Sequence, residues 1–214
     1  MRAAIGLTLG LATGAAPAAA DPTRLVAMGD SLTQGFGLPQ GEGLVPQLQA
    51  WLAARGHEVV VINAGVSGDT TAGGVSRLDW TLADRPQAMI VALGGNDLLR
   101  GIDPRATRAN LDAILTRLGE EEIPALLVGL PAPGNFGPDW QASFAAIFPE
   151  LAQEHGTLLH PDMLAPLMAA IEGGASPGAL VQPDGIHPSA AGVALIVEAM
   201  GPEVERLIAR AEAN

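Results

Sequence analysis

The stretch Leu25–Leu32 reads LVAMGDSL and joins an apolar run to a small polar turn. Its first four residues are apolar throughout, which is typical of a strand buried in a parallel sheet. Gly29 and Asp30 then end the run and place Ser31 just beyond the carboxyl end of the strand. Ligands of open parallel sheets bind outside the carboxyl ends of the strands, so this turn is expected to carry a functional residue.

Four more apolar runs occur downstream. Together with the first they predict strands at Arg24–Met28, Glu58–Ile62, Ala88–Leu93, Ala125–Leu130 and Thr157–Leu159. Between them lie segments with apolar residues three and four apart, which predict helices. One helix has Asp103 as its N-cap and Pro104 at its first position, and Pro188 suits the first turn of the last helix. This alternation predicts an α/β fold, with a parallel sheet covered on both faces.

Composition narrows the classes of function. The chain has 214 residues, a formal net charge of −12 and no cysteine. One domain is expected at this length, and the negative charge argues against nucleic acid or an anionic membrane surface as a primary partner. The absence of cysteine excludes disulfides, thiolate catalysis and cysteine metal sites. The histidines are scattered, so neither a metal site nor a cofactor is predicted.

The N-terminal residues 1–20 resemble an export signal. Arg2 is followed by small apolar residues, and Ala18–Ala20 offers a cleavage site before Asp21. The pattern predicts removal near Ala20 and a single domain over residues 21–214, exported to the periplasm or secreted. The apolar part is too short to span a bilayer, so no stable membrane insertion is expected. The alternative is an N-terminal helix of a cytosolic protein.

Polar loops also follow the second and third predicted strands. Residues 63–70 read NAGVSGDT, and residues 94–97 read GGND. Glycine, asparagine and aspartate are common in any turn, so each loop alone carries little information. Parallel strands end at one edge of a sheet, however, and both loops are therefore expected beside Ser31.

A downstream element completes a possible catalytic set. Residues 182–188 read QPDGIHP, with Asp184 and His187 three positions apart. Ser31 as nucleophile, His187 as general base and Asp184 as the acid that orients it are the three roles of a serine hydrolase. The structural alternatives are a helix-capping serine, a turn aspartate and a histidine that precedes a helix.

Other residues fit these roles less well. Ser67 lies in Gly65–Asp69, which is close to a G-x-S-x-G nucleophile turn but has an acidic residue in place of the last glycine. The remaining histidines lie in turns or at element ends and are poorer candidates for the base: His57, His155 and His160.

Acyl transfer also requires donors for the oxyanion. Gly68 offers a backbone N–H in a segment where the chain can approach a ligand closely, and Asn96 offers a side-chain amide from the third loop. A turn glycine and an asparagine that tolerates a left-handed turn are the structural alternatives.

Four blocks of the sequence resemble the consensus blocks of the SGNH (GDSL) hydrolases, in the same order and over nearly all of the mature chain. They are Gly29–Leu32, Gly68 within Asn63–Thr70, Gly94–Asp97 and Asp184–His187. Residues 93–101, 135–137 and 182–188 are further similar to the bacterial thioesterase I, lysophospholipase L1 and arylesterase group. Relatives often carry tyrosine where this chain has Phe136, so any contact of that hydroxyl is missing here.

The resemblance implies a three-layer α/β/α, flavodoxin-like fold with a five-stranded parallel sheet. It also implies a cofactor-free serine esterase or thioesterase that forms an acyl-enzyme on Ser31. His187 and Asp184 would complete the triad, and the N–H groups of Ser31 and Gly68 with the Asn96 side chain would form the oxyanion hole. The expected partner is a small ester or thioester, such as an acyl or aryl ester or a lysophospholipid, and the expected state is a monomer or weak oligomer.

Two loops are candidates for an apolar substrate groove. Leu98 and Leu99 adjoin the oxyanion loop, whereas Pro133, Asn135 and Phe136 follow the fourth strand. The alternative is that the leucines are core residues and the proline stiffens a turn.

Two other functions are weighed against the ester or thioester hydrolase. A polysaccharide O-acetyl esterase would use the same chemistry and accept only acetyl groups. A non-catalytic acyl- or carbohydrate-binding module is disfavoured, because every expected catalytic residue is present. One triad serves alcohol and thiol leaving groups alike, so the sequence does not separate thioesterase, lysophospholipase and arylesterase activities.

Overall fold

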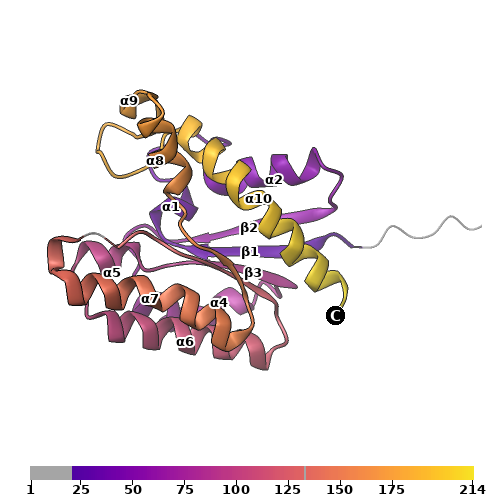
Figure 1. The fold of residues 1–214 in the computed structure, drawn as a ribbon. Coiled ribbons are helices and arrows are strands. Elements are labelled where there is room, and N and C mark those ends of the chain that lie inside the picture. Colours follow the sequence, from indigo (N-terminus) through magenta and orange to yellow (C-terminus); the bar gives the residue numbers. More distant parts are fainter. Residues whose placement is uncertain (1–20, 133) are drawn as a thin grey trace, which may run out of the picture.

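A computed structural model describes residues 21–132 and 134–214 (Figure 1). The predicted signal peptide, residues 1–20, and the candidate groove residue Pro133 lie outside the described residues. The strands are β1 (Thr23–Gly29), β2 (Val59–Gly65), β3 (Ala88–Ala92), β4 (Ala125–Val128) and β5 (Leu158–His160). The longer helices are α2 (Leu44–Ala53), α6 (Pro104–Glu120), α7 (Pro138–His155), α8 (Ala165–Glu172) and α10 (Ala190–Glu212). Short helices complete the fold: α1 (Ser31–Gln34), α3 (Thr71–Ser76), α4 (Leu78–Leu82), α5 (Gly95–Leu99), η1 (Gly134–Phe136) and α9 (Pro177–Leu180).

The five strands form one parallel sheet in the order β2-β1-β3-β4-β5. In the register of the sheet, Gly29 pairs with both Gly65 on β2 and Ala92 on β3. The loops that follow β1, β2 and β3 therefore leave the sheet at the same level. This register confirms the expected meeting of the three polar loops at one edge.

Side chains of each strand alternate between two hydrophobic layers, as the two-residue period of a strand requires. Leu25 and Ala27 face a cluster that includes residues of α2, α8 and α10. Val26 and Met28 face a second cluster, built with α6 and α7. Figure 1 shows the two groups of helices on opposite sides of the sheet. The predicted three-layer α/β/α fold is thus confirmed.

Helix boundaries follow local capping chemistry. Asp103 caps α6, since its Oδ1 accepts a hydrogen bond from the Arg105 N–H at 2.9 Å. At α10 the sequence prediction is wrong: the N-cap is Ser189, and Pro188 lies before the helix. Pro188 instead forms an isolated antiparallel bridge with Val181, which closes the loop that carries His187. Across the described ranges, no helix is both long and apolar enough to cross a membrane.

Candidate active site

The turn after β1 places Ser31 at the first position of α1. Asp30 is the N-cap, and its Oδ1 accepts a hydrogen bond from the Leu32 N–H at 3.0 Å. N–H groups in the first turn of a helix have no partner within that helix. Among the described residues, neither the Ser31 N–H nor the Gly68 N–H donates to a protein acceptor. Both amides therefore remain available to a ligand.

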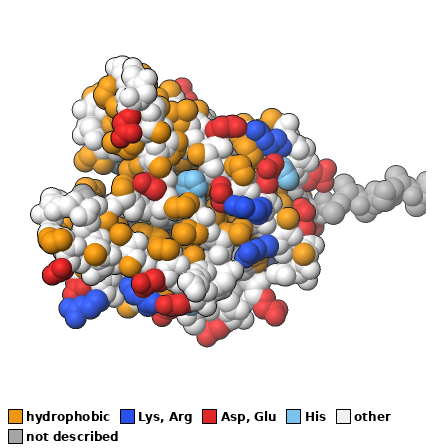
Figure 2. Space-filling model, in the orientation of Figure 1, with side chains coloured by type: hydrophobic (Ala, Val, Ile, Leu, Met, Phe, Trp, Pro, Cys, Tyr) orange, Lys and Arg blue, Asp and Glu red, His pale blue; other side chains and the backbone are white. Residues whose placement is uncertain are grey.

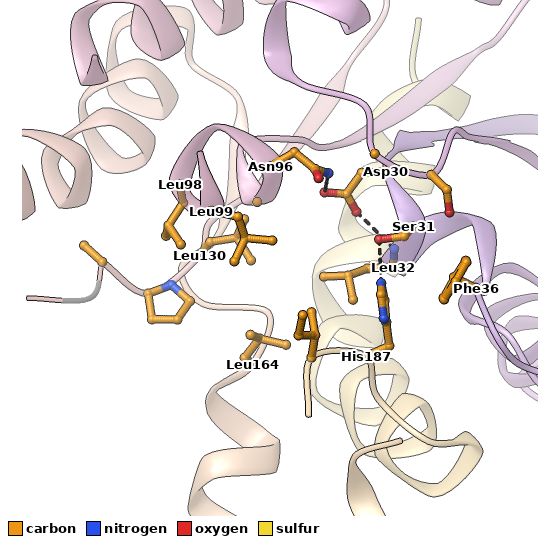
Figure 3. Close-up of a pocket in the computed structure, with 16 residues that line it drawn as sticks. Asp30, Ser31, Leu32, Phe36, Asn96, Leu98, Leu99, Leu130, Leu164 and His187 are labelled. Atoms are coloured by element: carbon orange, nitrogen blue, oxygen red, sulfur yellow. Dashed lines mark hydrogen bonds between the residues drawn. The ribbon is translucent and has the colours of Figure 1, made fainter. Parts of the chain in front are cut away.

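Ser31, His187 and Asp184 form a continuous chain of hydrogen bonds, although 156 positions separate the serine from the histidine. The His187 Nε2 lies 2.8 Å from the Ser31 Oγ (Figure 3). The His187 Nδ1 lies 2.6 Å from the Asp184 Oδ2. A proton on Nδ1, shared with the carboxylate, leaves Nε2 as the acceptor for the serine hydroxyl. This is the order of contacts that proton removal from Ser31 requires.

Asp184 is held as an anion by hydrogen bonds. Its Oδ1 accepts from the backbone N–H groups of His187 and Ile186, both at 3.0 Å. These two bonds, together with the bond to the His187 ring, lower the pKa of Asp184 to about 2. The carboxylate thus stays ionised at neutral pH, and it can stabilise an imidazolium on His187.

The loop that carries His187 is attached to the nucleophile loop through Gln182. The Gln182 backbone N–H donates to the His187 carbonyl at 2.8 Å. The Gln182 Nε2 donates to two more carbonyls, those of Phe36 at 2.8 Å and Pro188 at 2.9 Å. Sequence reasoning assigned no role to Gln182, because nothing local to residues 182–188 indicates that Phe36 lies opposite.

Three donors converge near Ser31. Asn96 lies in α5, and its Nδ2 donates to the Asp30 Oδ2 at 3.2 Å. Gly68 has a φ of +78°, a conformation that side chains rarely adopt, and its carbonyl accepts from the Arg100 Nη2 at 2.7 Å. Ser31, Gly68 and Asn96 line one cavity. The structure thus brings together the residues expected to form an oxyanion hole.

Asp30 is a site residue to which sequence reasoning gave no role. Its side chain is buried, with 3% of the residue exposed, and it touches both the nucleophile turn and Asn96. Burial raises the pKa of Asp30 above its ordinary value, and the hydrogen bonds from Leu32 and Asn96 partly oppose that shift. An ionised carboxylate only accepts hydrogen bonds. The Asn96 amide must therefore turn its NH₂ group, and not its oxygen, toward Asp30.

Arg77 joins the carboxyl ends of β1 and β2. Its guanidinium donates to the Gly29 carbonyl at 2.9 Å and to the Ala64 carbonyl at 2.8 Å, and it pairs with Asp69 at 2.7 Å. Both partners of this ion pair are largely buried. A charged group that satisfies two backbone carbonyls and a carboxylate at once fixes the distance between the two strand ends.

The buried side chain of Asp97 attaches the polar loop after β3 to two neighbouring helices. It is 1% exposed and accepts hydrogen bonds from the Thr71 N–H at 2.9 Å, the Thr71 hydroxyl at 2.5 Å and the Thr107 hydroxyl at 3.2 Å. It therefore joins α5 to α3 and α6. The acid of the GGND block has a structural role, whereas Asn96 beside it faces the cavity.

The cavity beside Ser31 has a volume of about 520 Å³ and mainly apolar walls. Of the predicted groove residues, Leu98 and Leu99 line it. Asn135 and Phe136 lie in η1 and are not among its described lining residues; the Phe136 ring packs on Trp140 at a centroid distance of 4.8 Å. Lining residues that the sequence did not indicate are Leu32, Phe36, Leu130, Leu164 and Ile186. Figure 2 shows one face of the molecule, on which hydrophobic side chains gather across the middle.

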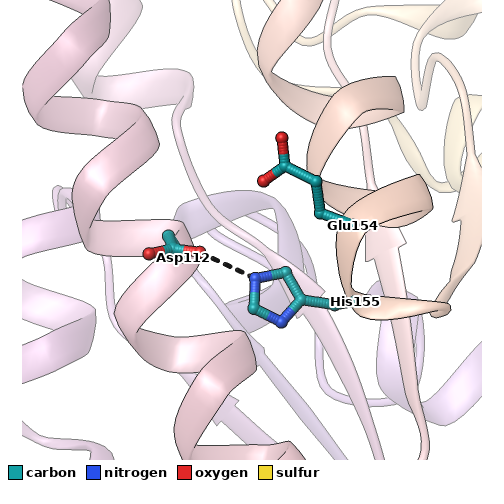
Figure 4. A group of neighbouring side chains, drawn as sticks. All are labelled: Asp112, Glu154 and His155. Atoms are coloured by element: carbon teal, nitrogen blue, oxygen red, sulfur yellow. Dashed lines mark hydrogen bonds and ion pairs between the residues drawn. The ribbon is translucent and has the colours of Figure 1, made fainter.

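One group of side chains elsewhere has the composition of a metal site. Asp112, Glu154 and His155 lie together between α6 and α7 (Figure 4). The His155 Nε2 is already bonded to the Asp112 Oδ1 at 2.7 Å, and Arg108 pairs with Glu154 at 2.5 Å. The group therefore connects two helices through one hydrogen bond and one ion pair. The other two histidines also face carboxylates, His57 facing Glu205 and His160 facing Glu203.

Comparison with known proteins agrees with this geometry. The model of the GDSL-like Lipase/Acylhydrolase family matches residues 27–195. The chain is 35% identical to Esterase TesA of Pseudomonas aeruginosa over 185 residues. This alignment covers 86% of this chain and 89% of that protein. The chain is 32% identical over 196 residues to thioesterase 1/protease 1/lysophospholipase L1 of Escherichia coli (strain K12), covering 89% of this chain and 87% of that protein.

A solved structure extends the comparison to three dimensions. The crystal structure of AlinE4, described as an SGNH-hydrolase family esterase, superposes with a TM-score of 0.71 at 41% identity. The match covers 88% of this chain and 98% of AlinE4. The similarity thus extends over the sheet, the helices and the loops that carry the candidate site.

Proposed function

The chain belongs to the GDSL-like lipase/acylhydrolase family, and we propose that it hydrolyses carboxylic esters and thioesters through an acyl-enzyme on Ser31. The observation that carries this proposal is the hydrogen-bonded chain from Asp184 through His187 to Ser31. The relatives named above are an esterase and a thioesterase with lysophospholipase activity in its name, so the chemistry agrees with the family.

The reaction follows from the contacts. The Ser31 Oγ bonds to the acyl carbon while its proton passes to the His187 Nε2, and Asp184 stabilises the resulting imidazolium. The negative oxygen of the tetrahedral intermediate accepts hydrogen bonds from the Ser31 and Gly68 N–H groups and from the Asn96 Nδ2. When the intermediate collapses, the leaving alcohol or thiol takes the proton from His187. Water then attacks the acyl-enzyme by the same route and releases the carboxylic acid.

The cavity walls favour an acyl chain longer than acetyl. Leucines at positions 98, 99, 130 and 164 face one space of about 520 Å³, far more than an acetyl group fills. Burial of apolar surface contributes roughly 0.8 kcal/mol for each methylene group, so a longer chain gains affinity there. This apolar lining argues against a polysaccharide O-acetyl esterase, which would need polar groups for a sugar chain.

Export is part of the proposal. The support is the sequence of residues 1–20, with a basic start, a short apolar stretch and small residues before Asp21. An N-terminal sequence of the protein recovered from the host that begins at Asp21 would support cleavage there. Recovery of the uncleaved chain would argue against it.

The test of the activity is a series of p-nitrophenyl esters, from acetate to palmitate, with the purified protein and its Ser31→Ala variant. We expect turnover that extends to medium or long chains and disappears in the variant. A fluorophosphonate probe should label the parent protein and leave Ser31→Ala unlabelled. Activity confined to acetate would favour the deacetylase, and activity that survives in Ser31→Ala would remove Ser31 from the mechanism.

A further inference from the structure

The cavity has apolar surface on two sides of the catalytic pair. In Figure 3, Leu98, Leu99 and Leu130 lie on one side of Ser31 and His187, and Phe36 lies on the other. The leucine side adjoins Asn96, since Asn96, Leu98 and Leu99 all belong to α5. The Phe36 side adjoins the general base. The two sides therefore differ in which part of the reaction they face.

Phe36 is held against the catalytic imidazole. Its ring centroid lies 4.7 Å from that of His187, at an interplanar angle of 38°. The Gln182 Nε2 donates a hydrogen bond to the Phe36 carbonyl oxygen at 2.8 Å and so holds the backbone of Phe36 in place. Gly37 follows with a φ of +74°, and a Cβ there would lie 2.2 Å from the Gln182 Oε1, so this turn accepts only glycine without rearrangement.

Despite these restraints, the ring itself is left half uncovered. Phe36 is 50% exposed, which is unusual for a large apolar side chain. An aromatic residue that is fixed by its backbone and open at its face is suited to contact a ligand. Phe36 also lines the cavity together with Ser31 and His187.

The chemistry of acyl transfer decides which part of the substrate meets which side. The leaving oxygen or sulfur must take its proton from the His187 Nε2, so the leaving group lies nearest the imidazole. The acyl chain occupies the other branch of the tetrahedral carbon, toward the leucines of α5. A leaving group at the imidazole therefore comes within reach of the exposed face of Phe36.

We propose, on the basis of the serine hydrolase function above, that Phe36 determines specificity for the leaving group. Its ring would pack against the departing alcohol or thiol and favour planar aromatic or other bulky apolar leaving groups. Aromatic pairs contribute about 0.5–1.5 kcal/mol beyond simple burial, which corresponds to roughly a two- to twelvefold preference. Acyl-chain preference, in contrast, belongs to the leucine side.

The experiment varies the two halves of the ester separately. One series keeps butyrate and changes the leaving group from methanol to phenol and 2-naphthol; the other keeps methanol and extends the acyl group from acetyl to octanoyl. Each ester is measured as kcat/KM of a variant relative to the parent protein, so the intrinsic reactivity of the ester cancels. The variants are Phe36→Ala, Phe36→Leu and, as a matched control on the opposite side, Leu130→Ala.

We expect Phe36→Ala to lower kcat/KM for the aryl esters about three- to tenfold more than for methyl butyrate, with no trend along the acyl series. Phe36→Leu should recover part of this loss, because it restores bulk without the planar ring. Leu130→Ala should show the reverse pattern. Inhibition by 2-naphthol, measured on methyl butyrate, should weaken in Phe36→Ala by a similar factor.

Two results would overturn the proposal. An equal loss on every ester, with unchanged inhibition by 2-naphthol, would mean that Phe36 only positions His187. A loss that grows with acyl length would assign Phe36 to the acyl chain. Failure of the hydrolase function is recognised separately, because Ser31→Ala would then match the parent protein on all esters.

Discussion

Asp30 and Asp184 both lie beside the Ser31–His187 pair, and their surroundings differ in almost every respect. Asp30 is buried at the end of β1, where burial raises its pKa. Asp184 is exposed in the loop before α10, where hydrogen bonds from His187 and Ile186 lower its pKa to about 2. Both side chains accept backbone hydrogen bonds, yet the pKa shifts have opposite sign.

The difference shows that the environment of a carboxylate, rather than its distance from the nucleophile, sets its task. In the proposed mechanism Asp184 needs a permanent charge, because it stabilises an imidazolium during each turnover. The surface loop supplies that charge with little cost of burial. Asp30 needs a fixed position more than a charge, because it orients a donor of the oxyanion hole. Asp30, at the end of β1, thus positions the Asn96 amide, whereas Asp184, in the loop before α10, supplies the negative charge beside His187.

The largest loss of activity is expected when Asp184 is replaced. Asp184→Asn removes the acceptor for the His187 Nδ1 proton and favours the wrong tautomer, so kcat/KM should fall about 10⁴-fold at neutral pH. Steady-state hydrolysis of p-nitrophenyl butyrate measures the loss, and thermal unfolding confirms that the variant is folded. A loss below tenfold in a folded variant would show that Asp184 is not the orienting acid.

The next effect concerns the donor that Asp30 holds. Asn96→Ala should lower kcat by about 10²- to 10³-fold while the protein stays folded, because one hydrogen bond to the oxyanion is lost mainly in the transition state. KM should change much less than kcat. Near-normal turnover would remove Asn96 from the mechanism.

A smaller effect is expected from Asp30 itself. Asp30→Asn keeps an oxygen that can cap α1, but it lets the Asn96 amide turn its NH₂ group away from the oxyanion. The loss should be about tenfold in kcat, which corresponds to one weakened hydrogen bond of roughly 1.4 kcal/mol. In the Asn96→Ala background the same substitution should cost almost nothing, because the two residues act through one contact. Independent, multiplying losses would contradict that coupling.

The smallest effect concerns the free energy of unfolding, whose dependence on pH should have opposite sign for the two carboxylates. The lowered pKa of Asp184 stabilises the folded protein above the ordinary value of 3.8, and this contribution is lost as pH falls toward about 2. The raised pKa of Asp30 acts oppositely, since stability declines as pH rises from 3.8 through that raised value.

Urea unfolding at a series of pH values measures this difference. Relative to the parent protein, Asp30→Asn should gain stability as pH rises from 4 to 7. Asp184→Asn should lose relative stability as pH rises above 2 and level off beyond 3.8. Parallel curves for the two variants would contradict the assignment of opposite shifts.

Much of the fold could be predicted because its signals are local. The runs at residues 24–28 and 88–93 became β1 and β3 within one residue at each end, since a buried strand needs apolar side chains on both faces. The Asp103 cap could also be predicted, because an aspartate directly before a helix-starting proline is a local signal. Pro188 was misplaced because its bridge to Val181 is a pairing across a loop, which no helical periodicity can reveal.

The sequence by itself determined the chemistry that we propose for this protein. Ser31, Asp184 and His187 could be named from residue type, order and spacing, because proton transfer demands those side chains and parallel strands deliver them to one edge of the sheet.

The tertiary structure alone decided the surroundings of that chemistry. It placed Phe36 against His187 and added Leu164 to the cavity wall. It also buried Asp30, and that burial raises the pKa of its carboxyl group. These features arise from burial and from contacts between distant segments, which depend on how whole layers pack and not on any local pattern of residues.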